Sequence, residues 1–234
     1  MTEYCISAIG HISSAYKQKF AIPRQPRLVP QAKAKLIFEK EFNREEFVRG
    51  LDDFSHIWLI FRFHGTADKG YSPMVRPPRL GGNERKGVFA TRATFRPNAI
   101  GMSAVQLDAI EYKNGQLSLL LSGIDLLDGT PILDIKPYLP YSDALPQASA
   151  GFADCEPQTD MHVEFEPSVL NFIAQQIEYP ELTQFITNVL KQDPRPAYKK
   201  QKNAQQSYGM TLYDFNIRWQ VVGDTNLVTQ IEKS

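Results

Sequence analysis

The stretch that most limits how this chain folds is FSHIWLIFRFHG, residues 54–65. Its side chains alternate in character with a period of two, which is the period of a β-strand and not of a helix. One face is wholly apolar and comprises Ile57, Leu59, Phe61 and Phe63. The other face is mixed and comprises His56, Trp58, Ile60, Arg62 and His64. We therefore predict a strand with one face in a core and the other free to line a groove.

Further short strands surround this one in the sequence. Residues 103–112 and 116–122 flank Asn114-Gly115, the strongest short signal of a β-hairpin. We also predict strands at 4–9, 87–92 and 131–138. Hairpin spacing without a βαβ rhythm indicates an antiparallel sheet that curls or closes. The residues therefore predict a mainly β domain over residues 1–150, built as a barrel or a sandwich, and a small second domain.

The chain after residue 150 has a different pattern. The stretch 140–159 is rich in Pro, Ala, Ser, Asp and Gln, which is typical of a linker. Helices are predicted at 167–178 and 180–192, the second with an apolar stripe at helical spacing. Strands are predicted at 208–222 and 227–231. These features indicate a small α+β domain over residues 151–234.

The most distinctive polar segment is VRPPRLGGNERKGVFATRATFRPNAIGMS, residues 75–103, which we call the basic segment. It has a single acid, Glu84, although the whole chain balances 26 basic against 26 acidic residues. Its prolines limit backbone freedom, and its glycines allow close approach or a positive φ. Arginine forks on such a frame suit phosphate or carboxylate, whereas a lone arginine is more often solvated. The segment predicts an anion-binding surface built from Arg76, Arg79, Arg85, Lys86, Arg92 and Arg96.

Composition and cysteine content indicate the class of protein. No apolar run approaches the roughly 20 residues of a spanning helix, and the N-terminus shows no export signal. Cys5 and Cys155 lie far apart, which fits a reducing compartment better than a disulfide scaffold. We expect a cytoplasmic protein. The four histidines lack metal-ligand spacing, and no dinucleotide fingerprint, phosphate loop, HExxH or CxxC motif occurs, so we expect no metal site.

Five motifs occur in order through almost the whole chain. They are IPRQP (22–26), GLDDFSHIWLIFRFH (50–64), the basic segment, DLLDGTPILDIKPYLPY (125–141) and DPRPAY (193–198). Together they resemble one family, the TsaA-like tRNA methyltransferases. Members of that family methylate N6 of the threonylcarbamoyladenosine at position 37 of tRNA, beside the anticodon.

This resemblance implies a fold that is mainly β with α+β, in which a single-sheeted antiparallel β-barrel binds S-adenosylmethionine. A barrel in place of a dinucleotide-type fold would explain why no glycine fingerprint is present. It also implies a homodimer with the cofactor near the subunit interface, and tRNA, through its anticodon loop, as the substrate. Carried onto matching positions, the cofactor contacts are Gln25, Pro26, Arg27, His64, Gly65, Thr66, Arg92, Met102, Asp128, Gly129, Thr130, Pro131 and Ile132.

The acceptor nitrogen in threonylcarbamoyladenosine is a urea-type N–H that must lose its proton. We predict Asp134, beside Lys136 and Tyr138, as the base or orienting group. The structural alternatives are an ion pair of Asp134 with Lys136 across a strand face, and simple packing of Tyr138. Phosphates or the threonyl carboxylate would be held by Arg76, Arg79, Arg96, Lys199 and Lys200.

Two other functions would use the same residues. A non-catalytic RNA-binding module would bind an anticodon-like loop with these arginines and aromatic residues, but it needs no methyl-donor pocket. A hydrolase acting on a small anionic substrate would turn over without methyl donor or RNA.

Overall fold

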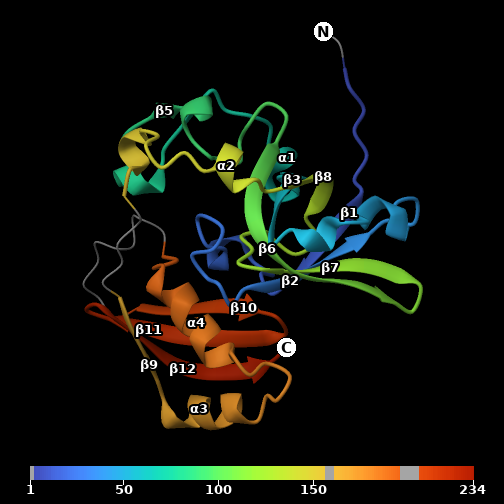
Figure 1. Cartoon of the computed structure of the whole chain (residues 1–234). Helices are drawn as coiled ribbons and strands as arrows, with labels where there is room; N and C mark the ends of the chain where they lie inside the picture. Colours follow the sequence, from blue (N-terminus) through green and yellow to red (C-terminus); the bar gives the residue numbers. More distant parts are fainter. Residues whose placement is uncertain (1–2, 156–160, 196–205) are drawn as a thin grey trace.

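The structure, a computed structural model, describes residues 3–155, 161–195 and 206–234 (Figure 1). Its N-terminal part is a closed antiparallel barrel with the strand order β1-β2-β7-β6-β3-β8. The barrel strands are β1 (Gly10–Ser14), β2 (Lys33–Phe38), β3 (His56–Arg62), β6 (Ile100–Lys113), β7 (Gln116–Ser122) and β8 (Pro131–Pro137). Closure leaves no strand edge unpaired in this sheet, which is how an antiparallel sheet avoids pairing with other chains. The predicted barrel is therefore confirmed.

Strand β3 is the strand predicted from the alternating pattern, and both of its faces are as expected. Ile57, Leu59 and Phe61 are buried inside the barrel, whereas the residues between them are half-buried or exposed on the outside. The strand pairs with β6 on one side and β8 on the other. It thereby holds the outer faces of three strands in one surface.

The predicted hairpin is also confirmed, and one residue outside it helps to hold its turn. Asn114 and Gly115 both have a positive φ, of 54° and 77°, as a tight two-residue turn between β6 and β7 requires. The side chain of Asn43 donates to the carbonyl of Gly115 (2.7 Å) and accepts from the N–H of Leu117 (2.6 Å). The short 3₁₀ turns η2 (Glu45–Val48) and η3 (Leu51–Asp53) follow Asn43 in the chain.

Two predicted strands of the barrel region were wrong. The strand predicted at 4–9 is β1 at Gly10–Ser14 instead. Gly10 lies inside the sheet, and the close approach of β2 explains why this residue is a glycine. A Cβ there would lie 2.5 Å from the carbonyl oxygen of Ile37. The strand predicted at 87–92 is mostly the 3₁₀ turn η5 (Val88–Ala90). It follows a two-residue ladder between β4 (Met74–Val75) and β5 (Lys86–Gly87).

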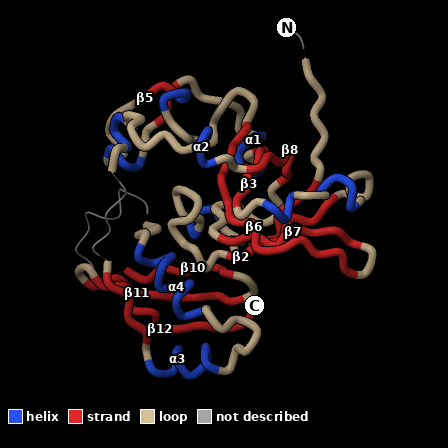
Figure 2. The backbone as a smooth tube through the Cα atoms, viewed as in Figure 1, coloured by secondary structure: helices blue, strands red, loops and turns tan. Residues whose placement is uncertain are grey.

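The basic segment forms an irregular layer over one end of the barrel, together with the chain around residues 140–155 (Figure 2). Besides β4, β5 and η5 it contains η4 (Pro78–Leu80), which contacts η6 (Gly151–Ala153). The short helices α1 (His64–Ala67) and α2 (Pro140–Asp143) belong to the same layer. Few strands support these loops, so turns and side-chain hydrogen bonds determine their shape.

The C-terminal part is a four-stranded sheet with the order β10-β11-β12-β9 and two helices. Its elements are β9 (His162–Phe165), α3 (Pro167–Ala174), α4 (Leu182–Lys191), β10 (Gln206–Leu212), β11 (Phe215–Val222) and β12 (Thr225–Lys233). Both helices were predicted, and the apolar stripe of α4 is buried. The single strand predicted at 208–222 is a hairpin of β10 and β11 instead. Strand β9, which pairs parallel with β12, was not predicted.

The two parts pack closely against each other. The rings of Tyr16 and Phe185 lie 5.8 Å apart, and Tyr213 donates its N–H to the carbonyl of Ala15 (2.8 Å). The buried apolar side chains of both parts form one continuous cluster. A further contact between the two parts joins η1 (Lys19–Ala21) to β10. The boundary between residues 150 and 151 stays a prediction.

No helix among the described residues is both long enough and apolar enough to cross a membrane.

Candidate functional site

Three polar segments meet at one end of the barrel: the 22–27 loop, the basic segment and the turn at residues 125–130. Arg92 of the basic segment donates a hydrogen bond from Nη1 to Oε1 of Gln25 (2.5 Å). Arg27, two residues after Gln25, donates its backbone N–H to the carbonyl of Gly123 (2.8 Å), just before the 125–130 turn. These two bonds link the 22–27 loop to the other two segments. The predicted contacts Gln25, Arg27 and Arg92 therefore lie together.

The contact between Arg27 and Gly123 requires an unusual backbone. Both residues have φ of 68°, which is a left-handed conformation that costs free energy for an arginine. A Cβ on Gly123 would lie 3.3 Å from the Cα of Arg27, so the two backbones pack directly. Strained non-glycine residues that persist in a fold are often found at ligand sites. The position of Arg27 fits that pattern.

Asp125 is the most perturbed acid at this end of the barrel, and our sequence analysis did not choose it. One of its carboxylate oxygens, Oδ1, is buried without a hydrogen-bond partner among the described residues. Burial raises its pKa to about 6, against the lowering effects of the Ser103 hydroxyl and the Arg92 guanidinium. A buried acceptor beside a cation is a candidate ligand contact. The DLLDGT motif begins at Asp125, but sequence alone did not reveal that its side chain is buried.

The rest of the 125–130 turn is bound to the first strand. Asp128 accepts the N–H of Ser14 on Oδ1 (2.9 Å) and forms an ion pair with Lys17 (2.8 Å). The hydroxyl of Thr130 donates to the carbonyl of Leu127 (2.6 Å), and Gly129 donates its N–H to Ile12 (2.7 Å). These bonds hold the turn rigidly and present its outer edge.

The helical turn α1 completes this end of the barrel. It carries the predicted contacts His64, Gly65 and Thr66. A Cβ placed on Gly65 would lie 3.5 Å from the side chain of Leu127, so α1 and the 125–130 turn are neighbours. Pro131 and the buried Ile132 begin β8 directly after that turn.

The predicted base and one predicted cofactor contact share the outer face of the barrel. Met102 and Asp134 are both register partners of Ile60, on opposite sides of β3. Two strand spacings separate them, or about 10 Å. The pairing of β3 with β8 is irregular just beyond Asp134. Bulges are common where a strand re-aims a side chain.

The side chains around Asp134 form the two contacts that were given as structural alternatives. Asp134 is exposed and forms an ion pair with Lys136 (Oδ2 to Nζ, 3.5 Å). The ring of Tyr138 packs against Trp58, with the centroids 5.6 Å apart. Trp58 in turn donates its indole N–H to Asp143 (2.8 Å). The structural alternatives are therefore realised, and any role of these residues in proton transfer stays a prediction.

The predicted substrate-binding cations differ in their surroundings. Arg76 and Arg79 are exposed on the basic segment. Arg96 is half-buried and donates from Nη1 to the carbonyls of Thr91 (2.7 Å) and Val88 (3.2 Å), so it also shapes its own loop. The predictions for 199 and 200 fall outside the described residues and concern Lys199 and Lys200.

The arrangement fits a ligand that carries both hydrogen-bond donors and negative charge. The unpartnered Oδ1 of Asp125 can accept from a hydroxyl or amino group, and Arg92 can bind a carboxylate. S-adenosylmethionine has ribose hydroxyls, two amino groups and a carboxylate, so these residues fit it. In the described ranges 3–155, 161–195 and 206–234, no group of His, Cys, Asp and Glu side chains is arranged to hold a metal ion.

Comparisons with known proteins show which family the chain resembles over almost its whole length. A sequence model described as the tRNA-methyltransferase O N-terminal domain matches residues 11–144, and one described as the TrmO C-terminal domain matches residues 158–234. A tRNA (adenine(37)-N6)-methyltransferase of Escherichia coli is 50% identical over 222 residues, covering 94% of each chain. A Pseudomonas aeruginosa relative, which bears the name of an S-adenosylmethionine-dependent methyltransferase, is 46% identical and covers 92% of each.

Solved structures give the same result. A crystal structure of TrmO from Pseudomonas aeruginosa superimposes with a TM-score of 0.80 at 38% identity. The match covers 100% of this chain and 99% of the other. The similarity therefore extends over both the barrel and the C-terminal part.

Proposed function

This chain belongs to the tRNA-methyltransferase O family, and from that membership we propose that it transfers a methyl group from S-adenosylmethionine to N6 of adenosine 37 in tRNA. The observation that carries the proposal is the convergence of three loops on the buried carboxylate of Asp125, beside Arg92 and Gln25. These groups could bind a methyl donor, whereas a plain RNA-binding module would need no pocket for one. The names of the relatives likewise favour a methyltransferase over both the RNA-binding module and the hydrolase.

The residues at the barrel end would hold the cofactor by complementary chemistry. Gln25, Arg27 and Arg92 would bind its carboxylate and polar edge, and Asp125 would accept from a hydroxyl or amino group. When bound, S-adenosylmethionine supplies an electrophilic methyl group on a sulfonium. The protein contributes mainly position, because an in-line displacement gains most from holding the two reactants in alignment. Met102 and the turn 128–132 would form the remaining wall.

We propose that the adenosine carries the threonylcarbamoyl group. Its carboxylate, like a tRNA phosphate, is an anion of the type that arginine forks bind, and Arg76, Arg79 and Arg96 on the basic segment would hold one or other of these groups. Lys199 and Lys200 would contribute further phosphate contacts. Asp134 would take up or orient the proton that leaves the acceptor nitrogen, with Lys136 and Tyr138 positioning it.

The assembly and location are further parts of this proposal. We propose a homodimer, supported by the exposed apolar side chains of Ile100 and Met102 on the outer face of β6. We propose a cytoplasmic location, supported by the tRNA substrate and by Cys5 and Cys155, both free and exposed. The two domains would meet between residues 150 and 151, which lies between the ranges that the two family models match.

The direct test follows transfer of radiolabelled methyl from S-adenosylmethionine to tRNA with and without the threonylcarbamoyl modification. Label in modified tRNA alone would establish both the reaction and its acceptor. Label in both tRNAs would retain the methyltransferase and refute the threonylcarbamoyl requirement. Absence of label from both, for a protein that still binds tRNA, would refute the enzyme. Sedimentation of wild type and Met102→Asp tests the dimer, which the substitution is expected to dissociate.

A further inference from the structure

A pocket of about 450 Å³ lies where the two parts of the molecule meet, on the side of the 22–27 loop that bears Arg24. Three segments form its walls: residues 19–29, the start of the basic segment, and the end of α4 with the residues after it. A cavity of this volume is within the range of small-ligand sites. Its lining includes residues of three of the motifs, IPRQP, the basic segment and DPRPAY, but none of the predicted cofactor contacts.

The charged side chains that line the pocket are all cations: Lys19, Arg24, Arg76 and Arg195. Within the part of the chain that the structure describes, Lys19, Arg24 and Arg76 form no ion pair with an acid. All three are exposed, so the pocket presents their positive charge to solvent. A concave surface lined by one sign of charge concentrates its field on ligands of the opposite sign.

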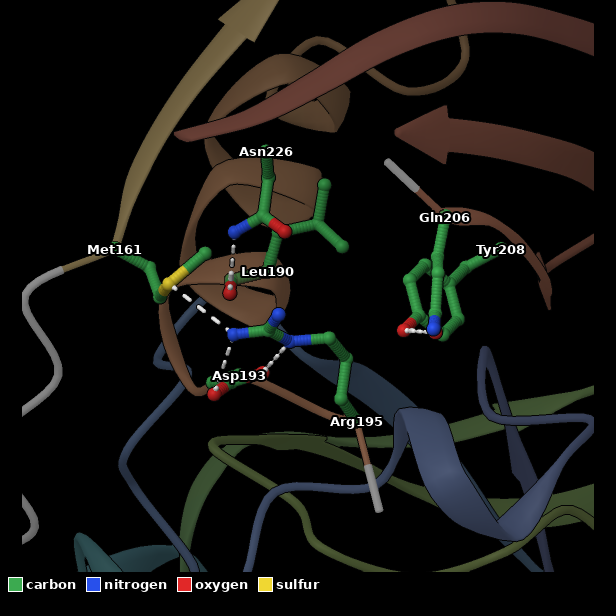
Figure 3. Close-up of polar contacts among 7 residues, drawn as sticks. All are labelled: Met161, Leu190, Asp193, Arg195, Gln206, Tyr208 and Asn226. Atoms are coloured by element: carbon green, nitrogen blue, oxygen red, sulfur yellow. Dashed lines mark hydrogen bonds and ion pairs between the residues drawn. The ribbon is translucent and has the colours of Figure 1, made fainter. Parts of the chain in front are cut away.

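Arg195 has a different role in the same pocket. Its guanidinium forms a two-point ion pair with Asp193, with Nε to Oδ1 at 2.7 Å and Nη2 to Oδ2 at 3.2 Å (Figure 3). It also reaches the sulfur of Met161 (3.7 Å), and Asp193 is buried. These contacts fix the wall that the C-terminal part supplies. They also neutralise Arg195, so the uncompensated charge comes from the other three cations.

The end of α4 is unfavourable for an anion. Val189 and Gln192 line the pocket, and a helix C-terminus carries a partial negative charge of about half an elementary charge. One carbonyl of the last turn, that of Leu190, accepts from the side chain of Asn226 (3.3 Å), which reduces the effect (Figure 3). Three unpaired cations exceed this partial charge several-fold, so the pocket remains suited to an anion.

From this geometry we infer that the pocket binds one backbone phosphate of the tRNA, with room for the attached nucleoside. The inference deepens the proposed function, on which it rests. Arg24 is the neighbour of Gln25, so one short loop would contact the phosphate on one side and the cofactor on the other. The α4 end supplies part of the wall, so the C-terminal part takes part in holding the substrate. Arginine is suited to such a contact because its fork can donate two parallel bonds to phosphate.

The test compares tRNA affinity across a range of salt concentrations for Arg24→Gln, Arg76→Gln and the double variant. Each single substitution is expected to weaken binding about tenfold, the loss of one charge-assisted contact. Because both side chains hold the same phosphate, we expect the slope of log K against log salt to fall by about 0.7 to 0.9 in each single variant. The double variant should show the same fall and not twice that value. The double variant should accordingly bind more tightly than the product of the single effects predicts.

Two controls accompany these variants. Arg218→Gln removes the same charge from an exposed site on β11, outside the pocket, and should leave affinity and slope unchanged. Arg24→Lys keeps the charge but not the fork, so it should keep the slope and lose only part of the affinity.

Wild-type affinity and slope in Arg24→Gln and Arg76→Gln would overturn the inference, as would a slope that falls by twice the single value in the double variant. Both results presuppose a wild-type protein that binds and methylates tRNA. Wild-type protein that does neither would instead overturn the proposed function, and the inference with it. The two failures are therefore distinguishable in one experiment.

Discussion

The guanidinium of Arg92 donates a hydrogen bond to the side-chain oxygen of Gln25, a residue 67 positions earlier in the chain. This single contact links the proline-framed 22–27 loop to the basic segment. Arg92 also lowers the pKa of the buried Asp125, which places all three groups in one electrostatic environment. The relationship makes Arg92 the best single residue with which to test the proposed cofactor site.

Arg92→Ala should weaken methyl-donor binding by about tenfold, because a charge-assisted hydrogen bond is lost and Gln25 is left without its partner. Calorimetric titration with S-adenosylmethionine measures this directly. Arg92→Lys keeps the charge and should retain part of the affinity. Unchanged affinity in Arg92→Ala would remove this residue from the cofactor site.

Asp125→Asn should change how stability depends on pH. The folded-state pKa of Asp125, about 6, is above its ordinary value of 3.8, so folding binds a proton between these values. The stability that the protonated carboxyl contributes is complete below about pH 4 and is lost as pH rises through 6, by about 3 kcal/mol at most. Urea unfolding at pH 4 and pH 7 should therefore show wild type losing more stability than Asp125→Asn. Equal losses in the two proteins would contradict the raised pKa.

Arg79→Ala should weaken tRNA binding and leave methyl-donor binding as it is in wild type. Arg79 is exposed on η4 and takes no part in the hydrogen bond between Gln25 and Arg92. Loss of one phosphate contact should lower the slope of log K against log salt by about 0.7 to 0.9. Filter binding at several salt concentrations provides the slope. An unaltered slope would show that Arg79 contacts no phosphate.

Gly10→Ala should destabilise the barrel, although the added group is a single methyl. The new Cβ would lie 2.5 Å from the carbonyl oxygen of Ile37 and 2.9 Å from the side chain of Leu36. Overpacking of this kind typically costs about 1 to 3 kcal/mol. Gly87→Ala is the matched control, since a Cβ there would meet nothing within 4 Å. Denaturant unfolding of both variants would contradict the steric argument if they proved equally stable.

The parts of the fold that the sequence predicted are those encoded locally. The alternation in residues 54–65 predicted β3, and Asn114-Gly115 predicted the β6–β7 hairpin, because each of these signals is contained within a few neighbouring residues. The helical stripe of α4 was readable for the same reason. The strand placed at 4–9 was wrong because Gly10 looked like a strand end. In the fold it is the point where β1 packs tightly against β2.

Three features could not be read from the sequence, and each depends on a distant contact. The short β9 becomes a strand only because β12 pairs with it. Asp125 looked like a turn residue, and its burial is a consequence of how the loops close over it. Asn43 makes both of its side-chain hydrogen bonds to the hairpin more than 70 residues later, which no local pattern shows.

The sequence by itself therefore determined β3, the β6–β7 hairpin and its turn, the helix α4, the concentration of positive charge in the basic segment, and the motifs that indicated the family. These depend on neighbouring residues, whose spacing is written directly in the chain. The tertiary structure alone decided the order in which the barrel strands pair, the burial of Asp125 near Arg92, and the position of Arg24 and Arg76 in one pocket with the end of α4. Such juxtapositions depend on which distant segments pack together, and that is decided by the burial of the whole core and not by any local pattern.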